Sequence, residues 1–148
     1  MFIARNILKI TDYAFQDNNG IRDKYMIILD RDAENVFIIH TLTTSNSNGF
    51  DPKEIGCYTK NKISYFYFPK NISIAENGFS FDKDTFVFFV GNIRKESLKI
   101  LEKYPIENIE VKGIMNKKSL KDLIDCILNS EYITAEQADY LRQTRKTL

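Results

Sequence analysis

Two apolar runs separated by a short polar turn are the feature that most constrains how this chain can fold. Residues 25–29 (Tyr-Met-Ile-Ile-Leu) and 36–39 (Val-Phe-Ile-Ile) are rich in β-branched and aromatic side chains, which favour strands over helices. The residues between them, 30–35, have turn chemistry. We therefore predict a β-hairpin whose second strand leads into residues 43–45 (Thr-Thr-Ser), so that three hydroxyl groups lie at one sheet edge.

The length and charge of the chain limit what this hairpin can belong to. A chain of 148 residues is long enough for a buried core, and we predict one domain over residues 1–148. Hydrophobic residues make up 43% and charged residues 28%, a composition that argues against disorder. The net charge of +1 excludes the broad basic field of nonspecific nucleic-acid binders, so any nucleic-acid site must be local.

Apolar runs, cysteines and histidine bear on location and cofactors. The longest apolar runs are about five residues, far below the roughly 20 that span a bilayer, and the N-terminus lacks a signal-peptide pattern. We expect a cytoplasmic protein with no membrane partner. Cys57 and Cys126 have neither metal-ligand spacing nor the density of a disulfide framework, so both are expected to be reduced. Because His40 is the single histidine, we expect no metal site and no cofactor. An ion bound by carboxylates alone is the alternative that the sequence leaves open.

The middle of the chain is unusually aromatic. We predict three or four strands between residues 63 and 90, the last of them, 86–90, buried on both faces. Residues 65–68 (Tyr-Phe-Tyr-Phe) are aromatic on both faces, so a second layer or a partner subunit should cover the outer one. Residues 1–10 have a mixed pattern that fits a strand or a short helix.

The last third of the chain has helical periodicity. Ile93, Leu98 and Leu101 have the spacing of a short helix that begins after Asn92 and is ended by Pro105. Apolar side chains recur at helical spacing from Leu120 to Leu128, and Asn116 is the expected N-cap. Thr134 and Gln137 form a capping box, which predicts a final helix over residues 134–146.

Cations and hydroxyl groups of the hairpin are the candidate site chemistry. Arg22 and Lys24 lie two residues apart in an extended segment, so their side chains share a face and can converge on one anion. The hydroxyl groups of residues 43–45 can donate to phosphate oxygens. His40 could act as a general acid or base. Each feature also has an ordinary explanation: a solvated strand entry, a polar turn and a packed histidine.

The order of these segments resembles the MazF/PemK family of toxin endoribonucleases, whose fold relatives include the gyrase-poisoning CcdB proteins. Residues 24–29 leading to 42–45 look like the family's first hairpin, in which Arg-Pro precedes an apolar strand and the second strand ends in Thr-Thr or Thr-Ser. Residues 86–94 resemble a late strand of the family, and residues 111–116 resemble the motif that opens its C-terminal helix. The resemblance implies an α+β, mainly β fold: an SH3-like β-barrel with C-terminal helices. The predicted helix over 134–146 lies beyond the family's usual end.

The resemblance also implies a function. Such proteins are metal-independent endoribonucleases of toxin–antitoxin systems that act as homodimers on single-stranded RNA and are bound by a cognate antitoxin. A 2′-hydroxyl attacks the adjacent phosphate and leaves a 2′,3′-cyclic phosphate and a 5′-hydroxyl. Lys24 or Arg22 would stabilise the phosphate charge, and Thr43 would position the phosphate. The implied substrate-binding residues are Thr44, Ser45, Asn19 and His40.

One departure from the family pattern supports a second function. The family's Arg-Pro pair is replaced by Lys24-Tyr25, and lysine is a mobile point charge where arginine is a bidentate fork. Arg22, two residues away, could take the place of that arginine. The alternative is a non-catalytic protein-binding module on the same barrel, either a gyrase-inhibitor-like toxin or a subunit of a complex.

Overall fold

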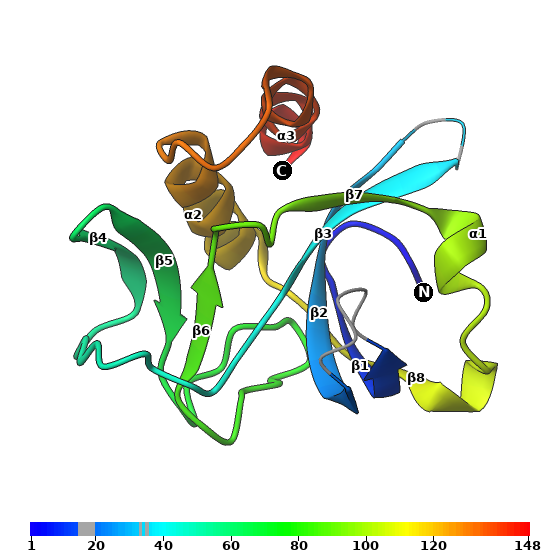
Figure 1. Cartoon of the computed structure of the whole chain (residues 1–148), viewed down its shortest axis with the longest axis horizontal. Helices are drawn as coiled ribbons and strands as arrows, with labels where there is room; N and C mark the ends of the chain where they lie inside the picture. Colours follow the sequence, from blue (N-terminus) through cyan, green and yellow to red (C-terminus); the bar gives the residue numbers. More distant parts are fainter. Residues whose placement is uncertain (15–19, 33, 35) are drawn as a thin grey trace.

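The computed structural model describes residues 1–14, 20–32, 34 and 36–148. These residues form an α+β, mainly β structure with two antiparallel sheets and three α-helices (Figure 1). The strands are β1 (Asn6–Ala14), β2 (Ile21–Arg31), β3 (Phe37–Leu42), β4 (Gly56–Lys60), β5 (Ile63–Phe68), β6 (Thr85–Phe88), β7 (Arg94–Ser97) and β8 (Ile109–Ile114). The helices are α1 (Leu98–Leu101), α2 (Lys117–Leu128) and α3 (Ala135–Thr147), with a 3-10 turn η1 (Ile106–Asn108).

The predicted hairpin is the centre of the larger sheet. Its five strands follow the order β7-β3-β2-β1-β8, and β2 pairs with β3 antiparallel, as in the pair Ile27 and Thr41. The smaller sheet has the order β4-β5-β6. The strands do not close a barrel within the described residues, so the α+β, mainly β class is confirmed and the SH3-like barrel stays a prediction.

Strands β2 and β3, at the centre of the larger sheet, are buried on both faces over residues 26–29 and 38–42, which explains the apolar runs there. On one face Ile27 and Leu29 join a core formed with β5, β6 and α2, and on the other Met26 and Ile28 join a second core with α1. Successive residues of a strand point to opposite faces, so every position of residues 26–29 is fully buried.

The two C-terminal helices begin where the sequence predicts. The side chain of Asn116 accepts a hydrogen bond from the Ser119 amide (2.8 Å) before α2, and the capping box of Thr134 and Gln137 is present before α3. Helix α2 packs on β4 and β5, and α3 packs on α2 and β2 (Figure 1). None of the described helices has the length and apolar character needed to span a bilayer.

The structure differs from two predictions of secondary structure. Residues 93–101 are not one short helix, because Arg94–Ser97 pairs with β3 as strand β7, and Ser97 then caps a single helical turn, α1. The fully described stretch from residue 63 to residue 90 holds two strands, β5 and β6, where three or four were predicted. The apolar segment around Ile74 forms a loop that is tied to the residue after β8 through the bridge of Ala75 and Met115. The N-terminal segment, whose sequence fits a strand or a short helix, contains strand β1.

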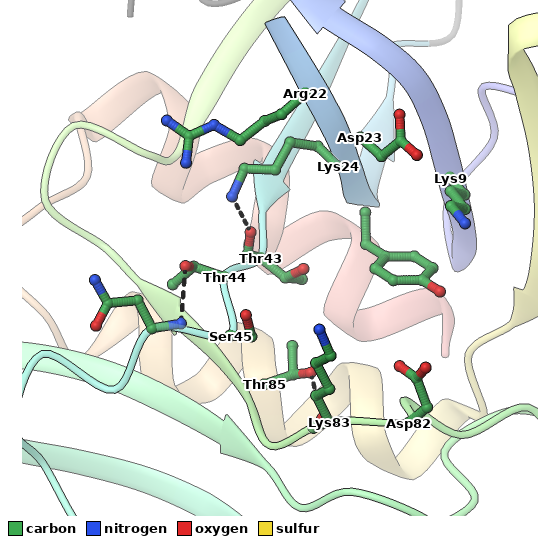
Figure 2. Close-up of a pocket in the computed structure, with 12 residues that line it drawn as sticks. Lys9, Arg22, Asp23, Lys24, Thr43, Thr44, Ser45, Asp82, Lys83 and Thr85 are labelled. Atoms are coloured by element: carbon green, nitrogen blue, oxygen red, sulfur yellow. Dashed lines mark hydrogen bonds between the residues drawn. The ribbon is translucent and has the colours of Figure 1, made fainter. Parts of the chain in front are cut away.

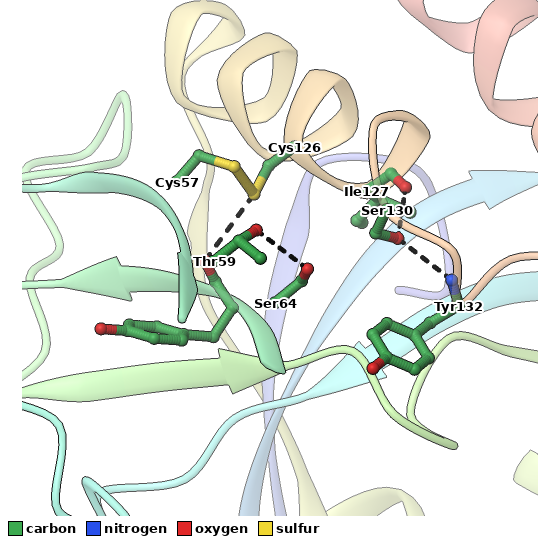
Figure 3. Close-up of a disulfide and its surroundings, with 8 residues drawn as sticks. Cys57, Thr59, Ser64, Cys126, Ile127, Ser130 and Tyr132 are labelled. Atoms are coloured by element: carbon green, nitrogen blue, oxygen red, sulfur yellow. Dashed lines mark hydrogen bonds between the residues drawn. A yellow bond between two sulfur atoms is a disulfide. The ribbon is translucent and has the colours of Figure 1, made fainter. Parts of the chain in front are cut away.

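Cys57 and Cys126 form a disulfide, so the prediction that both are reduced is wrong (Figure 3). Packing of α2 on β4 brings the two Cα atoms to 5.5 Å, well within the range of a disulfide. The cysteines are separated by 69 in sequence, and the sequence carries no local signal of which strand α2 covers, so this contact could not be predicted.

The outer aromatic face of the smaller sheet is covered by residues of the same chain. Tyr65, Tyr67 and Phe86 are buried there. The Phe50 ring lies 4.9 Å from that of Tyr65, and Tyr58 stacks on Tyr65 at 5.4 Å between ring centroids. The second layer that the sequence calls for therefore includes Phe50, from the loop before β4.

Gly113 on β8 should not tolerate a side chain. A Cβ atom there would lie 2.8 Å from Asn77 Oδ1 and 2.9 Å from Phe79 Cβ, closer than real Cβ contacts. We expect Gly113→Ala to lower the free energy of unfolding by about 1–3 kcal/mol, the usual cost of overpacking. Urea denaturation of the variant beside the wild type measures the change, and an unshifted midpoint would mean that the 75–79 segment moves aside freely.

Candidate functional site

A pocket of about 400 Å³ lies where the two sheets meet, and it collects the cations and hydroxyl groups of the hairpin (Figure 2). Strand β2 contributes Arg22 and Lys24, and the chain after β3 contributes residues 43–45. Five of the seven residues predicted to form a site therefore line a single pocket.

The remaining two predicted residues have different outcomes. His40 does not line the pocket: it is fully buried in the larger sheet, and its Nε2 lies 2.6 Å from Oε2 of buried Glu96 on β7. The ionised carboxylate can only accept, so Nε2 carries the proton and donates it. His40 is thus a packed, paired histidine here. Asn19 lies outside the described residues.

The hydroxyl-bearing wall of the pocket is fixed to both sheets. The Thr43 amide donates to the Tyr25 carbonyl of β2 (3.1 Å). Thr44 exchanges two backbone hydrogen bonds with Phe86 of β6, at 2.9 and 2.8 Å. Because consecutive residues are held by different sheets, the wall is pre-organised and its position depends on how the two sheets meet.

Asn92, in the turn between β6 and β7, reinforces this wall. Its side-chain amide donates to the carbonyls of Leu42 and Phe88, both at 2.8 Å, and its Oδ1 accepts from the Leu42 amide at 3.1 Å. The side chain of Asn92 thus links the end of β3 to the end of β6 by hydrogen bonds. It is a positioning residue for the pocket.

Lys24 is the most unusual cation in the pocket. Its Nζ donates to the Thr43 carbonyl at 2.8 Å, and the side chain is half-buried. Burial lowers the pKa of the Lys24 ammonium, and the positive charge of neighbouring Arg22 lowers it further. An ammonium in this setting gives up its proton more readily than an ordinary lysine does.

The other residues that line the pocket were not predicted. Lys9 comes from β1, and Lys83 with Thr85 comes from the start of β6 and the residues before it (Figure 2). The carboxylates of Asp23 and Asp82 also line the pocket, so its four cations leave a net charge of two positive units. Lys83 stands in an Asp-Lys-Asp run, which looks like a solvated turn in sequence and gives no signal of a site.

The donor set of the pocket suits an oxyanion. Ammonium, guanidinium and hydroxyl groups all donate to phosphate oxygens. Within the described residues no group of three or more His, Cys, Asp or Glu side chains is arranged to hold a metal ion.

Comparisons with known proteins add no identification, because no family model, curated protein or solved structure matches this chain.

Proposed function

We propose that this chain is a metal-independent endoribonuclease of toxin–antitoxin type that cleaves single-stranded RNA. The observation that carries the proposal is the convergence of Arg22 and Lys24 with the hydroxyl groups of residues 43–45 in one pocket. The resemblance of the sequence to the MazF/PemK family supports the same reading. In the same proposal the protein acts as a cytoplasmic homodimer, and a cognate antitoxin blocks the pocket.

The proposed fold is a divergent SH3-like barrel of the MazF/CcdB type. The two backbone hydrogen bonds between Thr44 and Phe86 support it, because they continue the line of β3 from the larger sheet onto the edge of the smaller one. The pocket lies beside this join.

In the proposed reaction the RNA phosphate lies between the two β2 cations and the Thr43–Thr44 wall. The guanidinium of Arg22 binds the two non-bridging phosphate oxygens, and the hydroxyl of Thr44 donates to one of them. Oγ1 of Thr44 accepts a hydrogen bond from the Asn46 amide (3.1 Å), which leaves its own proton for the ligand. The phosphate is thereby held in place before reaction.

Lys24 is the proposed acid of the reaction. The substrate's 2′-oxygen forms a bond to phosphorus while the bond to the 5′-oxygen breaks, so no water is consumed. The Lys24 ammonium protonates the leaving 5′-oxygen, and its lowered pKa makes it a stronger acid than an ordinary lysine. The proton of the 2′-hydroxyl goes to a pocket carboxylate, Asp23 or Asp82.

The test is cleavage of single-stranded RNA by the pure protein in EDTA. We expect products with 2′,3′-cyclic phosphate ends, and we expect Lys24→Ala to lower the rate about 100-fold, the typical loss when one transition-state donor is removed. Lys60→Ala, which removes an exposed cation from β4, is the matched control and should cleave at the wild-type rate. RNA that stays intact across varied sequences would rule out the ribonuclease.

A non-catalytic binding module on the same fold is the second candidate. It is favoured by the engagement of Lys24 with the Thr43 carbonyl, which makes this lysine part of the wall as well as a cation of the pocket. In that case the pocket binds a protein or nucleic-acid anion without reaction, and RNA is bound but not cleaved.

A further inference from the structure

We propose that the pocket has two anion subsites and takes two neighbouring phosphodiesters of one nucleic-acid strand. The first subsite is formed by Arg22, Lys24 and the Thr43–Thr44 wall, and the second by Lys83. The inference rests on the proposed function only in taking the ligand to be a nucleic-acid strand.

The cations of the pocket come from opposite sides of it. In Figure 2 Arg22 and Lys24 extend from β2 on one side, while Lys83 rises from the segment before β6 on the other. Four cations against two carboxylates leave two positive charges. A phosphodiester carries one negative charge, so two of them balance the pocket.

The backbone at Lys83 is held in place by hydrogen bonds of the neighbouring residues. A lysine that binds a ligand needs a fixed backbone, whereas a solvated surface lysine does not. Oδ1 of Asp84 accepts hydrogen bonds from the Tyr67 hydroxyl and the Lys70 amide, both at 3.0 Å. The Thr85 hydroxyl donates to the Lys83 carbonyl at 2.8 Å. The next residue, Phe86, is the one bridged to Thr44, so the two walls of the pocket are hydrogen-bonded to each other.

Lys83 is flanked in the chain by Asp82 and Asp84, and the ion pairs found among the described residues join it to neither. Asp84 does not line the pocket, and its hydrogen bonds to the Lys70 amide and the Tyr67 hydroxyl lower its pKa. Asp23 accepts from the Asp12 amide at 3.1 Å. The ion pairs found among the described residues include neither Lys83 nor Lys9.

The pocket is also large enough for this ligand. A volume of about 400 Å³ falls in the lower part of the range of small-molecule sites, which suits a piece of one strand better than a duplex. Ser45 also lines the pocket, and its hydroxyl can bind sugar or base groups of the linking nucleotide.

The test measures binding of 2′-O-methyl oligouridylates, which lack the attacking hydroxyl, to the full chain by calorimetry. A dinucleotide has one phosphodiester and a trinucleotide has two. We expect the trinucleotide to bind the wild type about tenfold more tightly, the usual worth of one charge-assisted hydrogen-bonded contact. Lys83→Ala should remove this gain, and Lys83→Arg should keep it.

The control is Lys70→Ala, which removes an exposed lysine whose side chain is outside the pocket and should keep the tenfold gain. Lys83→Ala should also flatten the dependence of log affinity on log salt by about 0.7, the value for one phosphate contact on a single strand. Equal affinity of the wild type for both oligonucleotides, or equal loss of both on Lys83→Ala, would overturn the inference. So would uridine 5′-monophosphate binding as tightly as the trinucleotide, because a single dianion would then satisfy the pocket.

This test and the cleavage test fail separately. A Lys83-dependent gain with uncleaved RNA would leave the two subsites in place and reject the nuclease. Cleavage of RNA without a Lys83-dependent gain would reject the second subsite alone.

Discussion

Reduction of the Cys57–Cys126 disulfide is expected to lower the free energy of unfolding by about 4 kcal/mol, the loop-entropy value for cysteines some 70 residues apart. The bond joins β4 to α2 across 69 positions, so it removes many conformations from the unfolded chain. We expect native packing to change little on reduction, because a disulfide acts mainly on the unfolded chain. Urea denaturation with and without dithiothreitol measures the difference.

The matched control for this prediction is Cys57→Ser. Cys57 is exposed, whereas Cys126 is buried, so the substitution at position 57 disturbs the core least. The variant should have the stability of the reduced wild type and should not respond to dithiothreitol. If iodoacetamide labels both cysteines of the purified, unreduced protein, the disulfide is absent in solution and the prediction is wrong.

The disulfide also links the stability of the protein to where it is located. Disulfides persist in oxidising compartments and are rare in the cytosol, where thiols are kept reduced. The cytoplasmic location that was predicted from the sequence therefore has a consequence for the stability of the protein. A cytoplasmic form would be the dithiol, and it would lack about 4 kcal/mol of the stability of the oxidised form.

Local signals in the sequence predicted local structure well. The caps at Asn116 and Thr134 and the strands of the central hairpin depend on residues a few positions apart, and all three predictions are confirmed. The cations and hydroxyl groups of the candidate site could be paired for the same reason, because β2 and β3 are neighbours in both sequence and space.

The features that the sequence did not reveal are long-range contacts. Asn92 binds Leu42 from 50 positions away, and Lys83 reaches the pocket only because β6 is bridged to the chain after β3. The sequence around a polar residue in a turn does not indicate which distant strand that residue contacts. One side of the site could therefore be predicted, and the other follows from the way that the two sheets join.

The pair of His40 and Glu96 gives the second large expected effect. Glu96→Ala should lower the free energy of unfolding by about 1–3 kcal/mol, because it leaves a buried hydrogen-bond donor without its partner. The exposed fractions of the two side chains are 0% and 7%, and the His40 Nδ1 atom has no hydrogen-bond partner within the described part of the chain. Urea denaturation above pH 4.5 measures the loss.

Two variants separate loss of the partner from loss of packing. Glu96→Gln keeps an oxygen that accepts the Nε2 proton and should cost less than Glu96→Ala. Replacing both residues by leucine should also cost less than Glu96→Ala, because it removes the His40 donor together with its acceptor. If Glu96→Ala is no less stable than either variant, the pair is not what stabilises this region.

The pH dependence gives an independent check on the same pair. The hydrogen bond from His40 lowers the pKa of the Glu96 carboxyl below its ordinary value of 4.5, so the folded protein holds this proton less tightly than the unfolded chain does. The stabilisation is therefore complete above pH 4.5 and is lost as the pH falls through the lower pKa of the folded state. Wild type and Glu96→Ala should accordingly converge in stability as the solution is acidified. A gap that stays constant into that acidic range would mean that the carboxylate charge contributes nothing to the stability of the pair.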